Sequence, residues 1–321
     1  MASLREIKDR IGSVRSTLKI TSAMKLVASA KLRKAQKAIE ALRPYERALA
    51  EILAAVGPVR PDVPASRLPS SLSADAETGF GGTNPAVAEA STLGNIGAAV
   101  TGPTAVVAIA SNSSLCGGFN ANVVRKALET IRGCEGEVEV YPLGRKMTDA
   151  LRRAGYTADQ DYNDLVAHPS YEQSSALARR LAERFERGEL ARVVLVYTSF
   201  VSASRQEPVA ETYLPFDGTN GVIPGLTRNL QVPSSSSVDD YILEPDAAAL
   251  AAQLLPQVTL LKFHAAILDS AAAEQAARTL AMQTASDNAE DLLGELTLEY
   301  NKGRQQKITA EILDLLGGAA Q

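Results

Sequence analysis

Residues 270–321 read SAAAEQAARTLAMQTASDNAEDLLGELTLEYNKGRQQKITAEILDLLGGAAQ, and this stretch contains no proline. Apolar or small residues recur along it in alternating steps of four and three, and they resume after a short polar interval. They are Ala289, Leu293, Leu296, Tyr300 and Gly303, followed by Ile308, Ile312 and Leu315. This spacing is the period of an α-helix that carries a narrow apolar seam and packs against one partner helix.

The helical pattern continues upstream of this stretch and predicts a single helix over 246–316. At about 1.5 Å per residue, such a helix is roughly 100 Å long. A compact domain of this size cannot bury a rod of that length. We therefore expect the helix to pair with another helix or to project into a partner.

The first fifty residues carry a matching pattern, in which twelve positions keep a strict alternation of steps of three and four. Ten of the twelve positions are apolar, and a pattern sustained over this many turns is typical of a coiled coil. Two unrelated amphipathic helices packed on a common core are the alternative interpretation. The positions are Leu4, Ile7, Ile11, Val14, Leu18, Thr21, Lys25, Ala28, Leu32, Ala35, Ile39 and Leu42.

The two terminal segments have opposite charge. Residues 1–50 contain twelve Lys and Arg against four Asp and Glu, whereas residues 269–321 contain nine acidic residues against four basic ones. This difference favours antiparallel pairing of the two helices, although each exposed ion pair contributes little. A basic helix can also bind nucleic-acid phosphates. Here the basic residues surround an apolar seam, no known reader motif is present and the whole chain has a net charge of −4, so we expect no nucleic-acid partner.

Four segments resemble, in order along the chain, the γ subunit of F-type ATP synthase of the bacterial type. They are ASLREIKDRIGSVRSTLKITSAMKLVASAKLRKAQ at 2–36, SLCGGFNANV at 114–123, YILEPDAAALAAQLLPQ at 241–257 and NAEDLLGELTLEYNKGRQQKITAEILDLLGGA at 288–319. The two terminal segments are long and specific, and together the matches cover most of the chain.

The composition agrees with long helices better than with a thick core. The chain has 321 residues, of which 45% are hydrophobic but 5% aromatic, and it contains no Trp. No run of apolar residues is long enough to span a bilayer, and the N-terminus lacks the apolar core of a signal peptide. The two cysteines, Cys116 and Cys134, indicate a reducing compartment and no disulfide framework.

The predicted fold class is α/β with a long α-helical coiled coil, formed by an antiparallel pair of N- and C-terminal helices around a central α/β domain. The resemblance implies that this central domain is Rossmann-like. Residues 57–103 are rich in Pro, Ser and Gly and predict a flexible linker or insertion. The predicted divisions are a coiled-coil helix over 1–56, this linker over 57–103, the α/β domain over 104–216, a polar loop over 217–241 and a coiled-coil helix over 242–321.

The middle of the chain alternates between strand and helix patterns, which predicts a small sheet covered by helices. The expected strands are 105–110, 138–142, 191–200 and 208–214, and the expected helices are 120–131, 146–154 and 171–187. The SLCGGFN stretch between the first strand and the first helix permits a nucleotide-binding interpretation, because glycines and a helix N-terminus can hold phosphate. Without a Gly-x-Gly-x-x-Gly or Gly-Lys-Ser/Thr motif, a tight structural turn at Gly117 and Gly118 is the favoured interpretation.

The sequence shows no motif for catalysis or metal binding. The two histidines, His168 and His264, have no Cys, Asp or second His at metal-ligand spacing, and no nucleophile motif occurs. The resemblance likewise implies no cofactor and no chemistry by the chain itself. By the same resemblance, we expect the chain to be a peripheral subunit of a proton-translocating ATP synthase on the cytoplasmic face of the bacterial inner membrane.

The resemblance implies that the helix pair is a central rotor shaft, which couples proton-driven rotation of a membrane c-ring to ATP synthesis at the β subunits. The expected partners are three α and three β subunits, the ε subunit and the c-ring. The implied contact residues are Met24, Lys25 and Ala28 in a collar, Arg304, Gln305 and Thr309 beside loops of the ring, and Ile312, Leu315 and Leu316 at an apolar tip. A nucleotide-binding α/β enzyme and a general coiled-coil scaffold are the alternatives.

Overall fold

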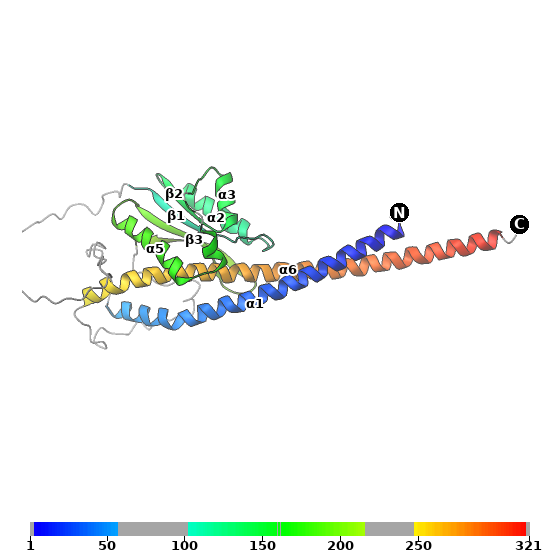
Figure 1. Cartoon of the computed structure of the whole chain (residues 1–321), viewed down its shortest axis with the longest axis horizontal. Helices are drawn as coiled ribbons and strands as arrows, with labels where there is room; N and C mark the ends of the chain where they lie inside the picture. The colour runs from blue at the N-terminus through cyan, green and yellow to red at the C-terminus, as the bar shows by residue number, and fades with distance from the viewer. Residues whose placement is uncertain (1–2, 57–101, 159, 161, 216–246, 319–321) are drawn as a thin grey trace, which may run out of the picture.

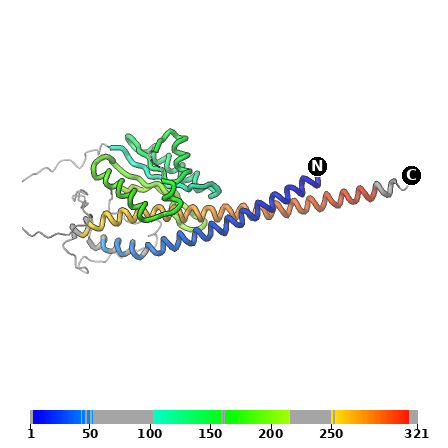
Figure 2. Tube along the Cα trace, viewed as in Figure 1, coloured from blue at the N-terminus to red at the C-terminus, as the bar shows by residue number. Residues whose placement is uncertain are grey.

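A computed structural model describes residues 3–56, 102–158, 160, 162–215 and 247–318. Two long helices, α1 (Leu4–Val56) and α6 (Ala247–Gly318), lie side by side with opposite directions, and an α/β domain sits against α6 near one end of the pair (Figure 1). The tube trace in Figure 2 shows the same rod-like outline. The polar loop predicted over 217–241 lies outside the described residues, as does the predicted linker apart from its last two residues.

The apolar seam predicted for the N-terminal helix is confirmed. All twelve predicted positions of α1 are buried or half-buried, and Ile7, Thr21, Ala28 and Ile39 are among the buried ones. On α6 the five predicted positions from Ala289 to Gly303 are likewise buried or half-buried. Burial therefore follows the four-three spacing on both helices as far as Gly303. The prediction that the seam resumes at Ile308 and Ile312 is wrong, because both side chains are exposed where α6 extends past the start of α1 at Leu4.

The two helices keep one register along their length. Leu4 lies against Gly303, where a Cβ added to the glycine would stand 3.0 Å from Leu4 Cδ2. Seventeen residues further along α1 and seventeen back along α6, the Thr21 and Ser286 hydroxyls are 2.8 Å apart. Another eighteen residues on each helix lead to the cluster that contains Ile39 and Leu268. Equal steps on both helices mean that neither inserts an extra residue into the pairing.

The central sheet has four strands in the order β2-β1-β3-β4. The strands β1 (Thr104–Ile109), β2 (Val138–Leu143) and β3 (Arg192–Phe200) are parallel, and β4 (Gln206–Leu214) is antiparallel to β3. All four predicted strands are confirmed, with bounds that differ by at most two residues. Buried Val, Leu and Ile on both faces of the parallel strands explain why their sequences read as continuous apolar runs.

Helices cover both faces of this sheet (Figure 1). The helices α2 (Phe119–Gly133) and α3 (Arg145–Arg153) pack on one face, and α4 (Asn163–Ala167), α5 (Tyr171–Glu186) and α6 pack on the other. The three helices predicted here are confirmed. The sequence did not predict α4, because five residues are too few to show a helical period.

Gly144 provides a test of this packing. It precedes α3 with φ of 97°, and a Cβ at this position would stand 2.1 Å from the carbonyl oxygen of Ala110. Gly155 has a similar φ of 91°, but nothing lies within 4 Å of its added Cβ. We expect Gly144→Ala to lower the free energy of unfolding by about 3 kcal/mol or more, and Gly155→Ala by about 1 kcal/mol. Urea denaturation measures both, and equal effects would show that the contact with Ala110 is unimportant.

A buried ion pair between α6 and the sheet provides a second test. Lys262 Nζ lies 2.6 Å from Glu211 Oε1, and the two side chains are 3% and 13% exposed. We expect Lys262→Met to cost about 3–5 kcal/mol, because it leaves the Glu211 carboxylate buried without this cation. The double variant Lys262→Met/Glu211→Leu should recover most of that loss, because no buried charge remains. Urea unfolding of both variants checks this, and a double variant as unstable as the single one contradicts it.

Candidate functional site

The end of α6 extends beyond its partner helix. Leu4 at the start of α1 lies opposite Gly303, and α6 continues from there to Gly318 (Figures 1 and 2). Three large apolar side chains on this extension are about half exposed or more, at 47% for Ile308, 51% for Ile312 and 62% for Leu313. Covering the exposed half of each such side chain in a partner would contribute about 1–2 kcal/mol. The extension therefore has the character of a binding element.

The predicted polar contact residues lie on the same extension. Arg304, Gln305 and Thr309 are all exposed. The Thr309 hydroxyl donates a hydrogen bond to the Gln305 carbonyl oxygen at 2.9 Å, so it is used within the helix. Within the described part of the chain, the ion pair on this extension joins Lys307 to Glu311 and leaves the Arg304 guanidinium facing solvent. A solvated guanidinium is suited to a bidentate contact with a carboxylate of a partner.

The tip residues predicted from the resemblance are described in part. Ile312 is exposed on the last turns of α6. Leu315 and Leu316 belong to the helical backbone of α6, whereas the placement of their side chains lies outside what the structure describes.

The three predicted collar residues on α1 differ in exposure, because their side chains leave the helix in different directions. Met24 and Lys25 are half-buried, but Ala28 is 1% exposed and its side chain lies in the seam against α6. Ala28 is therefore covered by α6 and presents no side chain to a partner. Its small size lets the two helices approach closely at this position. The outward side chains in this region are Leu26 and Val27, which are 69% and 57% exposed.

Sequence reasoning did not name Leu26 and Val27 as contact residues. The signal was present, since both lie in ITSAMKLVASA, where apolar residues occupy more than one face of the helix. Together with Ile20, they form an exposed apolar set on α1, which we call the collar patch. Ile20 and Val27 share one face of α1 and Leu26 lies about 100° around the helix from Val27, so the set is a candidate for contact with a partner.

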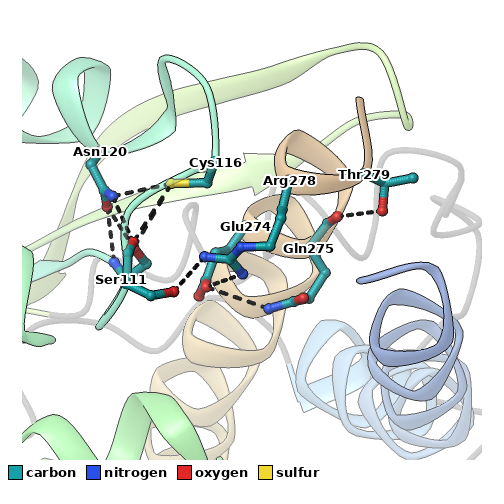
Figure 3. Close-up of polar contacts among 8 residues, drawn as sticks. Ser111, Cys116, Asn120, Glu274, Gln275, Arg278 and Thr279 are labelled. Atoms are coloured by element: carbon teal, nitrogen blue, oxygen red, sulfur yellow. Dashed lines mark hydrogen bonds and ion pairs between the residues drawn. The ribbon is translucent and has the colours of Figure 1, made fainter. Parts of the chain in front are cut away.

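The SLCGGFN loop is braced by its own polar groups (Figure 3). The Asn120 side-chain oxygen accepts hydrogen bonds from the backbone N–H and the hydroxyl of Ser111, at 3.1 and 2.9 Å. Its Nδ2 donates to Cys116 Sγ at 3.1 Å. Gly117 has φ of 58° and belongs to the turn that leads into α2. These contacts support the structural interpretation of the glycine pair.

A cavity of about 510 Å³ lies between this loop, the sheet and α6. Its polar lining includes Asn122, Thr198, Gln206 and Asn288, and none of the described residues that line it carries a charge. A nucleotide phosphate requires cations or an open array of backbone N–H groups. The described lining therefore offers no side-chain cation for a phosphate, and nucleotide binding would have to rest on backbone N–H groups at Gly117 and Gly118 alone. In the part of the chain that the structure describes, no cluster of three His, Cys, Asp or Glu side chains could hold a metal ion.

The perturbed pKa values in the chain are explained by burial and by hydrogen bonds within the fold. Burial lowers the pKa of His264, whose Nδ1 lies 2.8 Å from the Ser174 hydroxyl. A hydrogen bond from Arg184, 2.7 Å long, lowers the pKa of Glu139 at the edge strand β2. Glu139 also accepts a hydrogen bond from the Tyr141 hydroxyl at 2.6 Å, and burial together with this contact raises the pKa of Tyr141. The pattern is that of buried packing and a surface ion pair rather than of an active site.

Comparison with known proteins gives a consistent result. A family model described as ATP synthase matches residues 3–321. The ATP synthase gamma chain of Phocaeicola vulgatus is 42% identical over 323 residues and covers 99% of both chains. That of Bacteroides thetaiotaomicron is 43% identical over 328 residues and covers 100% of both.

The fold has counterparts among solved structures. A chain in the structure of Euglena gracilis mitochondrial ATP synthase, comprising OSCP, F1 and c-ring, has a TM-score of 0.59 and 20% identity, covering 99% of this chain and 93% of that one. A chain of the rotor of the same organism's enzyme has a TM-score of 0.54 and 19% identity, covering 95% and 98%. Because the family model spans nearly the whole chain and relatives above 40% identity cover its full length, the chain belongs to the ATP synthase gamma chain family.

Proposed function

We propose that this chain is the central rotor shaft of an F-type ATP synthase, which couples proton-driven rotation to ATP synthesis on other subunits. The observation that carries the proposal is the extension of α6 beyond α1, with its exposed Ile308, Ile312 and Leu313. An unpaired apolar helix end on a rod is costly in water. Enclosure of this end in the bore of a surrounding ring removes that cost.

The asymmetry of the rod provides the coupling. One side of the shaft is α1 with its collar patch, and the other is α6, so the cross-section has no three-fold symmetry (Figure 1). Each orientation of the shaft inside a ring of three α and three β subunits presents a different surface to each β subunit. A rotor of this kind shifts the conformational equilibrium of each site through differential contact. The chain itself performs no chemistry.

The remaining partners follow from the same proposal. The α/β domain, with an ε subunit beside it, contacts the c-ring and receives its rotation. The complex lies at the cytoplasmic face of a bacterial inner membrane, with this chain as a peripheral subunit. None of the helices that the structure describes is long and apolar enough to cross a membrane.

The contact surface has three parts in this proposal. Met24 and Lys25, with the collar patch, face the lower part of the β subunits. Arg304, Gln305 and Thr309 meet loops of the ring, where the guanidinium and the amide form charge-assisted hydrogen bonds to acidic groups. Ile312, Leu315 and Leu316 form the apolar end that turns in the bearing.

The experiment that tests the function is reconstitution. The purified chain is mixed with α and β subunits, the mass of the complex is determined and ATP hydrolysis is assayed. We expect one copy of this chain for three α and three β subunits, with hydrolysis above that of the α and β mixture. No complex, combined with nucleotide binding by the isolated chain, would favour an enzyme. Variable stoichiometry with many proteins would favour a scaffold.

Arg304→Ala tests the assignment at the tip. We expect ATP synthesis in membrane vesicles to fall by about tenfold to 100-fold, because a charge-assisted hydrogen bond contributes about 1.5–3 kcal/mol. The stability of the isolated chain should not change, since Arg304 is exposed. Lys302→Ala is the matched control, because Lys302 is also exposed but lies about 160° away around the helix. Unchanged synthesis by Arg304→Ala would remove Arg304 from the contact surface.

A further inference from the structure

One stretch of α6 is buried on all sides. Residues 261–270 are buried without exception, whereas toward the tip burial is confined to the seam. Phe263, Ala266 and Ile267 lie in the core of the α/β domain. Ala265 and Leu268 pack in the cluster that includes Ile39 of α1. The domain core and the coiled-coil seam therefore share α6, so a force on the domain acts directly on this helix.

Apolar packing by itself does not determine how such a force is transmitted. Close packing around residues 261–270 resists rotation of α6, because interdigitated side chains would have to move out of each other's way. Hydrogen bonds and ion pairs depend steeply on distance and angle, and they also oppose rotation of the helix relative to its surroundings. The polar contacts between α6 and the domain therefore add directional resistance to a turning force.

Strand β4 contacts α6 at two neighbouring positions. The ion pair between Lys262 Nζ and Glu211 Oε1 is 2.6 Å long and nearly excluded from water, which strengthens it relative to a surface pair. Tyr213, two residues further along the same strand, donates a hydrogen bond to the Thr259 carbonyl oxygen at 3.0 Å. β4 thus holds both a side chain and the backbone of α6.

Helix α5 contacts α6 from a different direction. His264 Nδ1 lies 2.8 Å from the Ser174 hydroxyl, and the rings of His264 and Tyr171 meet edge-on with centroids 5.5 Å apart. His264 and Lys262 are two residues apart, so their side chains leave the helix about 160° from each other. Contacts on two flanks oppose rotation of α6 in either direction.

A third contact lies about four turns further along α6. Arg278 donates hydrogen bonds to Glu274 Oε1 at 2.6 Å and to the Ser113 hydroxyl at 2.7 Å (Figure 3). Asn120 Nδ2 donates in turn to the Ser113 carbonyl oxygen at 3.2 Å, which connects this loop to the start of α2. A contact at a second point along the length of α6 opposes tilting of this helix relative to the sheet.

We propose that the contacts of Lys262 with Glu211 and of His264 with Ser174 form a torque-bearing joint between the α/β domain and the shaft. Lys262 and His264 act as positioning residues that make α6 rotate with the domain, and the contact of Arg278 with Ser113 keeps the two aligned. The inference rests on the proposed function, in which rotation enters at the domain and is used at the tip. Without the joint, the domain turns while α6 slips.

The test replaces the directional contacts of the joint with apolar ones. The joint variant is Lys262→Met/Glu211→Leu/His264→Phe/Ser174→Ala. Apolar replacement of a buried ion pair is often neutral or stabilising, so the chain should still fold and assemble. In the complete enzyme in membrane vesicles, we expect ATP hydrolysis to persist. The ratio of ATP-driven proton pumping to hydrolysis should fall by about tenfold or more, and an uncoupler should no longer stimulate hydrolysis.

A matched control restores the pair with reversed charge. Lys262→Glu/Glu211→Lys should return the pumping ratio to within about threefold of the unmodified enzyme, because an ion pair joins the same two positions again. If the joint variant does not assemble, Lys262→Met/Glu211→Leu alone is measured, and a partial fall in the ratio is expected. A normal ratio in whichever of these two apolar variants assembles overturns the joint. Failure of the unmodified chain to stimulate hydrolysis overturns the proposed function instead.

Discussion

The apolar seam between α1 and α6 is the interaction on which the rest of the molecule depends. It joins the two ends of the chain and holds them in one register from Leu4 and Gly303 to Leu49 and Val258. The described ion pairs of α6, such as Arg278 with Glu274 and Lys307 with Glu311, lie within α6 or reach the sheet. Shape and apolar contact therefore hold the pair together, and the opposite charges of the two helices act as a diffuse contribution.

The surroundings of α6 explain how its sequence changes along its length. Where the domain and α1 enclose α6, its side chains are buried on every face. Polar ones among them have partners, as the ion pair of Lys262 and the hydrogen bond of His264 show. Beyond the domain only the seam is covered, and Leu296 is buried while Leu298 is exposed. Beyond Gly303 nothing in the described chain covers it. A helix that is apolar all round needs a full enclosure, and one with a single stripe needs a single partner.

The same arrangement separates two tasks. In the proposed rotor the α/β domain receives the force, and its polar contacts connect it to α6. The tip carries exposed apolar and cationic side chains suited to contact with other proteins. The described residues that line the cavity beside Gly117 carry no charge that could pair with a phosphate. The molecule is organised to transmit movement between partners, and its perturbed titratable groups serve packing.

The sequence by itself determined the elements that depend on local periodicity. The seam positions of α1, those of α6 from Ala289 to Gly303, the four strands and three of the four helices of the domain could be predicted, because the side chains that are buried repeat at the period of the element. The same period at Ile308 and Ile312 could not show that α1 ends before reaching them. The resemblance of the terminal segments supplied the proposed contact residues. Helix α4 could not be predicted, because it is shorter than two turns.

Tertiary structure decided which residues are in contact with each other and which side chains stay exposed to solvent. Arg278 and Ser113 are 165 residues apart, and Glu211 and Lys262 come from a strand and a helix with no shared pattern. Periodicity placed Ala28 on the seam, but only the register with α6 showed that its side chain is covered while those of Leu26 and Val27 face outward. Burial of one residue by another depends on their positions in three dimensions, and local sequence carries no information about the partner's position.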